Sequence, residues 1–301
     1  MDNIYPAVGD SFKSGFVTLV GRPNAGKSTL LNRMVGQKVA IVSSRPQTTR
    51  NRVLGVLTKG ECQMVFLDTP GLHAPKNKLG DFMMRQADSA VRSVDLAVLV
   101  VEPSDKTEEA ELAVLRRCGC PVLLAINKID TVKKETLLSV IAAYAAVFDF
   151  AAVVPISALT GEGVEELWQE LASRLEEGPA FFPEDAVTDQ TERQLVAEFI
   201  REKALRTLDK EVPHGIAVEI ETFEQKSEDL VHIGAVIYCE KESHKGIIIG
   251  KGGSMLKKIA SAARTDMERL LGCRVYLEVF VKVKLNWRQS DAFLKNMGYV
   301  E

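Results

Sequence analysis

The sequence has few cysteines, and their spacing does not suit a metal site. None of the five belongs to a C-x-x-C pair, and Cys118-Gly119-Cys120 is too tight for the usual zinc spacing. We therefore expect reduced thiols, as in a cytosolic protein, rather than a structural zinc site or a disulfide framework.

Long apolar segments are also lacking. The chain has no run of about 18 or more apolar residues, so we expect no transmembrane helix. The start, Met1-Asp2-Asn3-Ile4-Tyr5, is acidic and lacks the apolar region of a signal peptide, so none is expected. At 301 residues, with 26% of them charged, the chain has an ordinary globular composition and is long enough for two domains.

A glycine-rich loop is the clearest motif that is present. Gly21–Ser28 fits G-x-x-x-x-G-K-[ST] and lies between an apolar, strand-like run (16–20) and a helical pattern. Backbone N–H groups and a helix N-terminus at this place bind phosphate. We expect Lys27 to reach the β- and γ-phosphates and Ser28 to ligate Mg²⁺. The predicted phosphate-binding residues are Gly21, Asn24, Ala25, Gly26, Lys27, Ser28 and Thr29.

Two further segments suit the magnesium and γ-phosphate side of such a site. Asp68-Thr69-Pro70-Gly71 ends an apolar run, so the carboxylate of Asp68 can hold Mg²⁺ and the N–H of Gly71 can approach a γ-phosphate. The polar segment 43–50 is either an ordinary surface loop or a switch that orders when a threonine meets Mg²⁺ and the γ-phosphate. The spacing does not decide which threonine does so, and we favour Thr49.

The base-binding motifs predict guanine rather than adenine. In Asn127-Lys128-Ile129-Asp130, the carboxylate of Asp130 can accept from N1–H and the 2-amino group of guanine, whereas adenine lacks these donors. We expect Lys128 to cover the base and Asn127 to tie this loop to the phosphate loop. Ser157-Ala158-Leu159 follows a further short strand and is expected to present a backbone N–H to guanine O6. The predicted ligands are therefore GTP and GDP, and Asp130 argues against an ATPase.

The pattern of the chain changes after residue 178. A proline- and glycine-containing stretch cannot continue a helix, so we expect a first domain at 1–178, a linker at 179–190 and a second domain at 191–301. Phe181 and Phe182 are expected to pack between the domains. The second domain has the predicted order helix, strand, strand, helix, strand, over 192–208, 216–222, 231–238, 254–271 and 274–283.

Basic residues gather in the last part of this domain, although the whole chain has a net charge of −3. Between Lys241 and Arg288 there are eleven Lys or Arg and four Asp or Glu. This stretch contains Gly250-Lys251-Gly252-Gly253, ahead of Lys257 and Lys258. A glycine loop of this kind lets a nucleic-acid backbone approach, and the lysines would meet phosphates. The alternative is a structural hinge with solvated lysines.

Together these motifs resemble one family over essentially the whole chain. The runs G-R-P-N-A-G-K-S, P-Q-T-T-R and D-T-P-G-L-H resemble the Era family of GTPases, and Gly250–Gly253 resembles the loop of a type II KH domain. The resemblance implies an α/β P-loop GTPase domain with a doubly wound mixed sheet, followed by a smaller α+β KH domain. Leu72 stands where many GTPases have a catalytic glutamine, which implies a subclass without it. His73 is not assigned a catalytic role.

The resemblance also implies ligands and partners. In related GTPases a P-loop asparagine helps to hold K⁺, which gives Asn24 a catalytic role beside Lys27 and Thr49; the alternative for Asn24 is an amide that stabilises the turn. The implied function is binding of the 3′ end of 16S rRNA, with help to 30S subunit assembly and rRNA maturation. The protein is expected to be a cytoplasmic monomer with weak peripheral association with the inner membrane. The alternative is a nucleotide-dependent signalling switch whose C-terminal domain binds a protein or a membrane.

Overall fold

The computed structural model describes residues 12–45, 47–71, 77–92, 94–104, 107, 109–209 and 212–299. Expectations for the first five residues, Leu72 and His73 concern positions outside this part of the chain. The chain forms two compact units: 1–40 with 49–74 and 83–189, and 41–48 with 75–82 and 190–301. The second unit therefore includes two short segments from the N-terminal half of the sequence.

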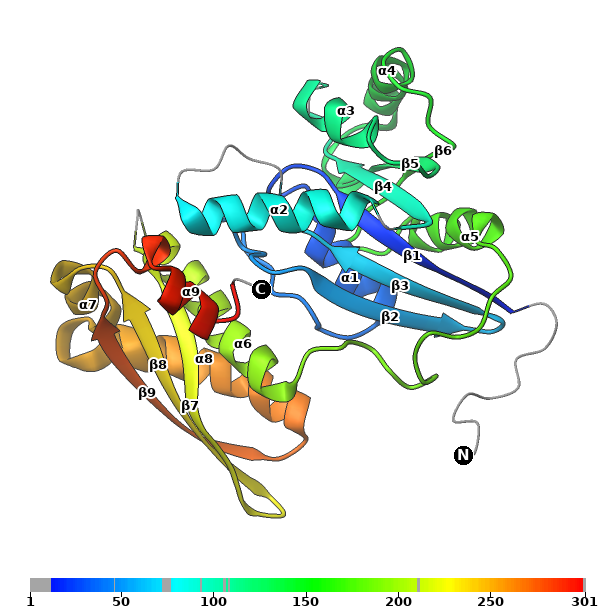
Figure 1. Cartoon of the computed structure of the whole chain (residues 1–301). Helices are drawn as coiled ribbons and strands as arrows, with labels where there is room; N and C mark the ends of the chain where they lie inside the picture. Colours follow the sequence, from blue (N-terminus) through cyan, green and yellow to red (C-terminus); the bar gives the residue numbers. More distant parts are fainter. Residues whose placement is uncertain are drawn as a thin grey trace. The chain divides into compact units, whose positions relative to one another are not determined.

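The first unit is built on a six-stranded mixed sheet with the order β2-β3-β1-β4-β5-β6 (Figure 1). All neighbours are parallel except β2 and β3. Most of these strands are buried on both faces, which explains their continuous apolar sequences. The strands are β1 (Lys13–Val20), β2 (Val53–Lys59), β3 (Cys62–Asp68), β4 (Leu96–Val101), β5 (Val122–Ile126) and β6 (Ala152–Pro155).

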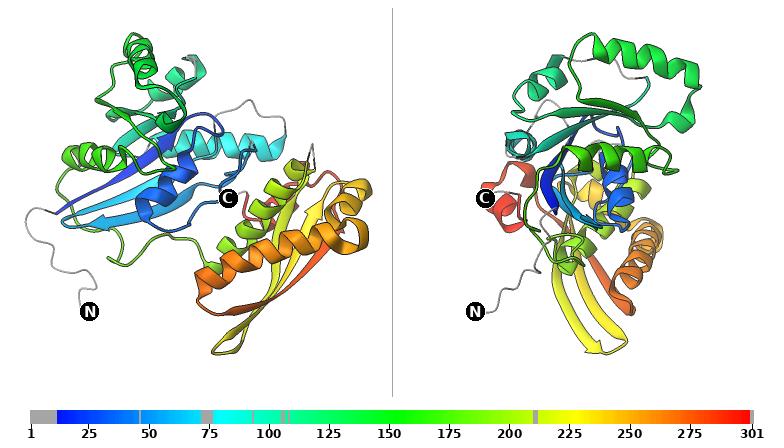
Figure 2. Two further views of the ribbon diagram at one scale, coloured as in Figure 1. Left: turned by 180° about the vertical axis from the view of Figure 1, so that it is seen from behind. Right: turned by 90° about the vertical axis from the view of Figure 1, so that its right-hand side faces the viewer.

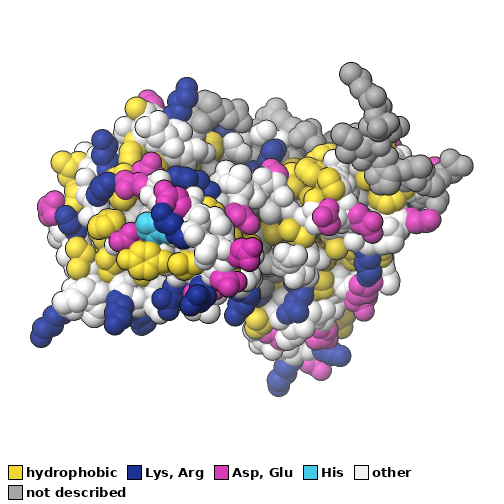
Figure 3. All heavy atoms as spheres, turned by 90° about the horizontal axis from the view of Figure 1, so that it is seen from below, with side chains coloured by type: hydrophobic (Ala, Val, Ile, Leu, Met, Phe, Trp, Pro, Cys, Tyr) yellow, Lys and Arg dark blue, Asp and Glu magenta, His cyan; other side chains and the backbone are white. Residues whose placement is uncertain are grey.

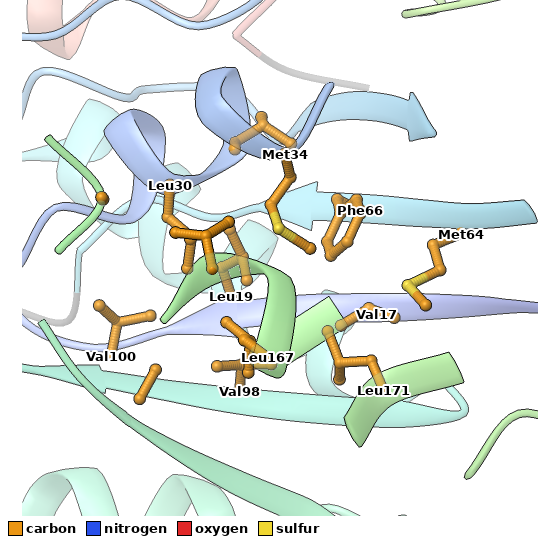
Figure 4. Close-up of a cluster of buried hydrophobic side chains, with 14 of the residues drawn as sticks. Val17, Leu19, Leu30, Met34, Met64, Phe66, Val98, Val100, Leu167 and Leu171 are labelled. Carbon is orange, nitrogen blue, oxygen red and sulfur yellow. The ribbon is translucent and has the colours of Figure 1, made fainter. Parts of the chain in front are cut away.

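Helices cover both faces of this sheet. On one face, α1 (Lys27–Val35) and α5 (Val164–Arg174) pack against alternate residues of the central strands. Figure 4 shows this core, in which Leu30 and Met34 of α1 and Leu167 and Leu171 of α5 lie over β1, β3 and β4. The other face carries α2 (Lys78–Arg92), α3 (Glu109–Leu115) and α4 (Lys134–Ala145). A short 3₁₀ helix, η1 (Ile129–Thr131), follows β5.

The second unit has a three-stranded sheet with the order β7-β8-β9. Strand β8 (Leu230–Cys239) is antiparallel to β7 (Ala217–Ser227) and parallel to β9 (Arg274–Val283). Helices α6 (Glu192–Thr207) and α8 (Ser254–Leu271) cover one face, as both views of Figure 2 show. Between β8 and α8 lie α7 (Glu242–Ile249) and the 3₁₀ turn η3 (Lys251–Gly253). The remaining elements are η2 (Pro213–Gly215), η4 (Trp287–Gln289) and α9 (Asp291–Asn296).

Local sequence signals explain where helix α6 begins. The Thr191 side chain accepts from the N–H of Gln194, and the Gln194 side chain accepts from the N–H of Thr191 at 2.8 Å. This capping box satisfies two backbone donors that a helix start leaves unpaired. At the other end of the unit, α9 packs on the sheet face that α6 and α8 leave open, where the Phe293 and Tyr238 ring centroids lie 5.1 Å apart.

Two helices, α7 and α9, were not predicted, and the isoleucine triplet ahead of the glycine loop forms the end of α7. Phe181 and Phe182, which were expected to pack between the domains, contact the first sheet: Phe181 lies against Phe16, with ring centroids 4.8 Å apart, and Phe182 packs beside β2 and β3. In the described residues, no helix combines the length and the apolarity needed to cross a membrane.

Candidate functional site

The phosphate loop closes tightly between β1 and α1. Gly26 has φ +99°, and a Cβ there would lie 2.1 Å from the Asn127 side-chain nitrogen, so only glycine fits. The buried Lys27 ammonium donates to the carbonyl oxygens of Gly21 and Arg22, both at 2.8 Å. Burial lowers the pKa of Lys27, while the carboxylates of Asp68 and Glu111 oppose this shift. The loop thus surrounds the Lys27 ammonium, which a bound phosphate group can reach.

Oxygen atoms from three separate segments converge beside this lysine. The Ser28 hydroxyl donates to Asp68 Oδ2 at 2.5 Å and lies 3.0 Å from Thr49 Oγ1, which also donates to Asp68 Oδ2 at 3.3 Å. Thr48 instead donates to the carbonyl of Arg45 at 2.6 Å. Of the two threonines, Thr49 is therefore the one that the structure brings to Ser28 and Asp68.

Asp68 carries the clearest electrostatic signal of a cation site. Its other oxygen, Oδ1, is buried and has no hydrogen-bond partner among the described residues. Burial raises the pKa of this carboxyl, against the opposing effects of Lys27, Ser28 and Thr49. An unpaired buried carboxylate oxygen beside two hydroxyl groups is a donor set that suits Mg²⁺.

The loop after β3 reaches the phosphate loop. A Cβ on Gly71 would lie 2.7 Å from the backbone nitrogen of Pro23, so a side chain at this position would clash with the phosphate loop itself. Asn24, in the same loop, adopts a left-handed conformation with φ +69°. Asn24 and Gly71 therefore both belong to a tight arrangement around the expected γ-phosphate position.

Two loops at the ends of β5 and β6 carry the residues that were predicted to bind the base. The Asn127 amide donates to the carbonyl of Ala25 at 2.8 Å, and its Oδ1 accepts from the N–H of Ala158 at 2.9 Å. Lys128 forms an ion pair with Glu102, which follows β4. Asp130 is exposed at the start of η1, where its carboxylate is accessible to a base.

Arg33 is a further residue of this site that the sequence motifs do not reveal. From α1, its guanidinium donates to the carbonyl of Ala158 at 3.2 Å and to that of Leu159. The Leu159 side chain itself is 71% exposed, so the loop is held through its backbone. No local pattern marks such an arginine, because its partners lie about 125 residues further along the chain.

The glycine loop of the second unit connects α7 to α8. Gly250, Gly252 and Gly253 all have positive φ, and a Cβ at Gly252 would meet no atom within 4 Å. Lys251, Lys257 and Lys258 are exposed, and no carboxylate in the described residues forms an ion pair with them. These three lysines are therefore available to an anionic partner at the N-terminal end of α8.

Charge elsewhere on the surface is mixed. Figure 3 shows Lys and Arg side chains interspersed with Asp, Glu and hydrophobic side chains over one face of the molecule. In the second unit, Lys226 pairs with Glu224 and Lys282 with Glu221 at 2.7 Å. The lysines around the glycine loop differ from these paired lysines in lacking such a carboxylate among the described residues.

Known protein families match both the nucleotide-site region and the region of the glycine loop. Residues 16–128 match the family described as "50S ribosome-binding GTPase", and residues 211–288 match the KH domain family. GTPase Era of Ruminiclostridium cellulolyticum is 50% identical over 292 residues, covering 96% of this chain and 98% of the relative. GTPase Era of Clostridioides difficile is 50% identical over 293 residues, with 96% and 99% covered.

Solved structures give the same answer for the fold. Era in complex with MgGDPNP and nucleotides 1506–1542 of 16S ribosomal RNA superimposes with a TM-score of 0.93 at 37% identity, covering 97% of this chain and 100% of the other. An Aquifex aeolicus Era variant bound to GDP.AlF4− gives a TM-score of 0.92 at 38% identity, with 96% and 100% covered. These matches confirm the predicted fold class, a P-loop GTPase domain followed by a KH domain, and the chain belongs to the Era family of GTPases.

Proposed function

We propose that this GTPase binds single-stranded RNA, at the 3′ end of 16S rRNA, through the loop Gly250–Gly253. The bound nucleotide controls that binding, and the protein thereby assists rRNA maturation and 30S subunit assembly. The observation that carries the proposal is the open glycine loop with Lys251, Lys257 and Lys258 at the start of α8. The solved Era complex with 16S rRNA nucleotides supports the choice of RNA.

The nucleotide site holds GTP or GDP with Mg²⁺. Ser28, Thr49 and Asp68 fit the metal because their oxygens lie 2.5–3.3 Å from one another and Asp68 Oδ1 is buried without a partner in the described chain. The loop residues 21–29 and Gly71 surround the phosphates. Asn127, Lys128, Asp130 and the segment 157–159 bind the guanine, with Arg33 holding that segment in place.

Hydrolysis proceeds by in-line attack of water on the γ-phosphate. Mg²⁺, when bound, neutralises charge on the β- and γ-phosphate oxygens. Lys27 exchanges its two carbonyl partners for phosphate oxygens and thereby stabilises the charge that develops on them. Thr49 reaches the γ-phosphate only when that group is present, so it distinguishes GTP from GDP. The gain in rate comes from positioning and electrostatics rather than from covalent chemistry.

Two further proposals concern the surroundings of the reaction. Asn24 would help to hold K⁺, which would supply positive charge to offset the negative charge that develops in the transition state. We further propose a monomer that acts in the cytoplasm, with weak peripheral attachment to the inner membrane, as the resemblance to the Era family implies. Light scattering tests whether the protein is a monomer, and vesicle flotation tests its attachment to a membrane.

The test of RNA binding uses the full chain with GDPNP, with GDP and without nucleotide. The RNA is a single strand matching the 16S 3′ end, with a scrambled strand beside it at fixed salt. We expect tight, sequence-dependent binding that GDPNP enhances. Gly252→Asp should abolish it, because the carboxylate repels phosphate; aspartate is among the residues that best tolerate the φ of +60° at this position.

Lysine variants provide a matched comparison. Lys257→Ala should lower the slope of RNA affinity against salt by about one counterion, while Lys226→Ala, a lysine paired with Glu224, should leave it unchanged. Equal, weak binding under every condition would reject the RNA proposal. That result would favour a signalling switch whose C-terminal domain binds a protein or a membrane.

A further inference from the structure

The segment just before Thr49 belongs structurally to the C-terminal unit. Residues 41–48 cluster with residues 190–301, and Ile41 is buried in the same hydrophobic core as Val196 and Ile200 of α6. Thr49 itself lies with Ser28 and Asp68 in the first unit. Thr48, which contacts α6, is therefore followed directly in the chain by Thr49, the expected metal ligand.

Glu202 and Arg206 hold the beginning of this segment. The backbone N–H of Val42 donates to Glu202 Oε1 at 2.9 Å. The Arg206 guanidinium donates twice to the carbonyl of Val42, at 2.9 and 2.6 Å, and pairs with Glu202 at 3.0 Å. Glu202 is fully buried, and Lys203 at 2.8 Å further balances its charge. Both polar groups of the Val42 backbone are therefore fixed by charged side chains of one helix.

Arg201 holds the end of the segment. Its buried guanidinium donates to the carbonyl of Thr48 and pairs with Glu198. In the middle, Arg45 donates to the carbonyl of Leu208 at 3.0 Å and to Asp209 at 2.9 Å. Helix α6 and the residues after it thus contact the segment at Val42, Arg45 and Thr48. The contact at Thr48 involves the peptide group that joins it to Thr49.

We propose that Arg201, Glu202 and Arg206 are positioning residues for GTP hydrolysis: the RNA-binding unit holds the 41–48 segment so that Thr49 can meet Mg²⁺ and the γ-phosphate. This inference rests on the proposed role of Thr49. Without these contacts, the segment must be ordered by the nucleotide alone, and the free-energy cost of that ordering falls on the triphosphate state. GDP does not need Thr49, so its binding should not change.

Arg206→Met tests this in the full chain, without RNA. Arg206 is half exposed, so the variant keeps the fold, and methionine retains much of the apolar stem. We expect kcat for GTP hydrolysis to fall about tenfold, a size typical of the coupling between two sites. The Mg²⁺ concentration needed for GDPNP binding should rise. GDP affinity should stay within about twofold of the wild type. A merely structural role would weaken both nucleotides alike.

Arg193→Met is the matched control. Arg193 lies on the same helix but donates to the carbonyls of Ile220 and Glu221 in β7, so its loss should leave kcat and the Mg²⁺ dependence unchanged. Arg206→Lys, which retains a charged donor, should recover part of the lost kcat. If Arg206→Met matches the control, the inference is overturned.

Thr49→Ala separates the two possible failures. A fall in kcat for Thr49→Ala together with a normal Arg206→Met would leave Thr49 in its role and reject the support from α6. A normal kcat for Thr49→Ala would reject the proposed role of Thr49, and the inference with it. A fall in both variants, with GDP affinity preserved, supports the inference.

Discussion

The side-chain amide of Asn127 donates to the carbonyl oxygen of Ala25 at 2.8 Å, across 102 positions of sequence. Together with the bond from the Ala158 N–H to Asn127 Oδ1, this contact joins the phosphate loop to both base loops. We therefore expect the affinity for guanine nucleotides to depend on Asn127 even if this residue does not contact the phosphates.

Asn127→Ala should weaken GTP and GDP binding by a similar factor, about 10- to 100-fold. The change leaves the carbonyl of Ala25 and the N–H of Ala158 buried without their partners, and each such loss typically costs about 1–3 kcal/mol. Titration with a fluorescent GDP and a fluorescent GDPNP measures both affinities. Affinities within twofold of the wild type in the folded variant would contradict the linking role.

Asp130→Asn should change base selection while the fold survives, because Asp130 is exposed. Asparagine can no longer accept from two guanine donors, but its amide can donate to the 2-carbonyl of xanthine. We expect GTP affinity to fall about 100-fold or more and XTP to become the better ligand. Competition between the two nucleotides gives the ratio directly. Retained preference for GTP would mean that Asp130 does not contact the base.

Asn24→Ala should remove the effect of potassium on turnover. In the wild type, hydrolysis should be slow in NaCl and faster in KCl, since K⁺ stabilises charge that Mg²⁺ and Lys27 do not fully balance. The variant should be equally slow in both salts, with Mg²⁺-dependent GDP affinity preserved. Phosphate release at matched ionic strength is the measurement, and equal wild-type rates in KCl and NaCl would exclude a potassium site.

The second unit should lose stability at high pH through Tyr238. Burial and the hydrogen bond to Glu219, at 2.8 Å, raise the pKa of this phenol to about 12, above the ordinary value of 10.0. The folded state therefore holds the proton more tightly than the unfolded chain, and the stability that this provides is present below pH 10 and lost as pH rises through about 12.

Tyr238→Phe tests this assignment, because phenylalanine keeps the ring against Phe293 and has no proton to lose. The difference in melting temperature between wild type and variant should narrow as pH rises from 10 to 12. A constant difference over that range would show that Tyr238 does not titrate as proposed.

Much of the fold follows from local sequence patterns. The apolar runs predicted the strands β1 and β3, and the helix 254–271 and the strand 274–283 match α8 and β9. The phosphate and base motifs predicted their loops because each is a short segment fixed to a strand end. Helix α7 was missed because Gly246 and three successive isoleucines give it no amphipathic period.

What the sequence could not predict are contacts between distant segments. Arg33 has no motif around it that predicts its carbonyl partners in the base loop. Arg201 and Glu202 lie on the buried side of α6, and nothing in the helical pattern indicates that they bind a segment about 150 positions earlier in the chain. The assignment of Thr49 rather than Thr48 likewise needed the position of Asp68.

Val187 and Thr188, near the end of the first unit, shield one edge of its sheet. Strand β2 is an edge strand, and the N–H of Val56 donates to the carbonyl of Val187 at 2.9 Å while Thr188 donates to the carbonyl of Leu54 at 2.6 Å. A truncated protein that ends at residue 178 would expose these backbone groups to other chains and invite edge-to-edge aggregation. An isolated GTPase domain should therefore extend to about residue 189, where the first compact unit ends.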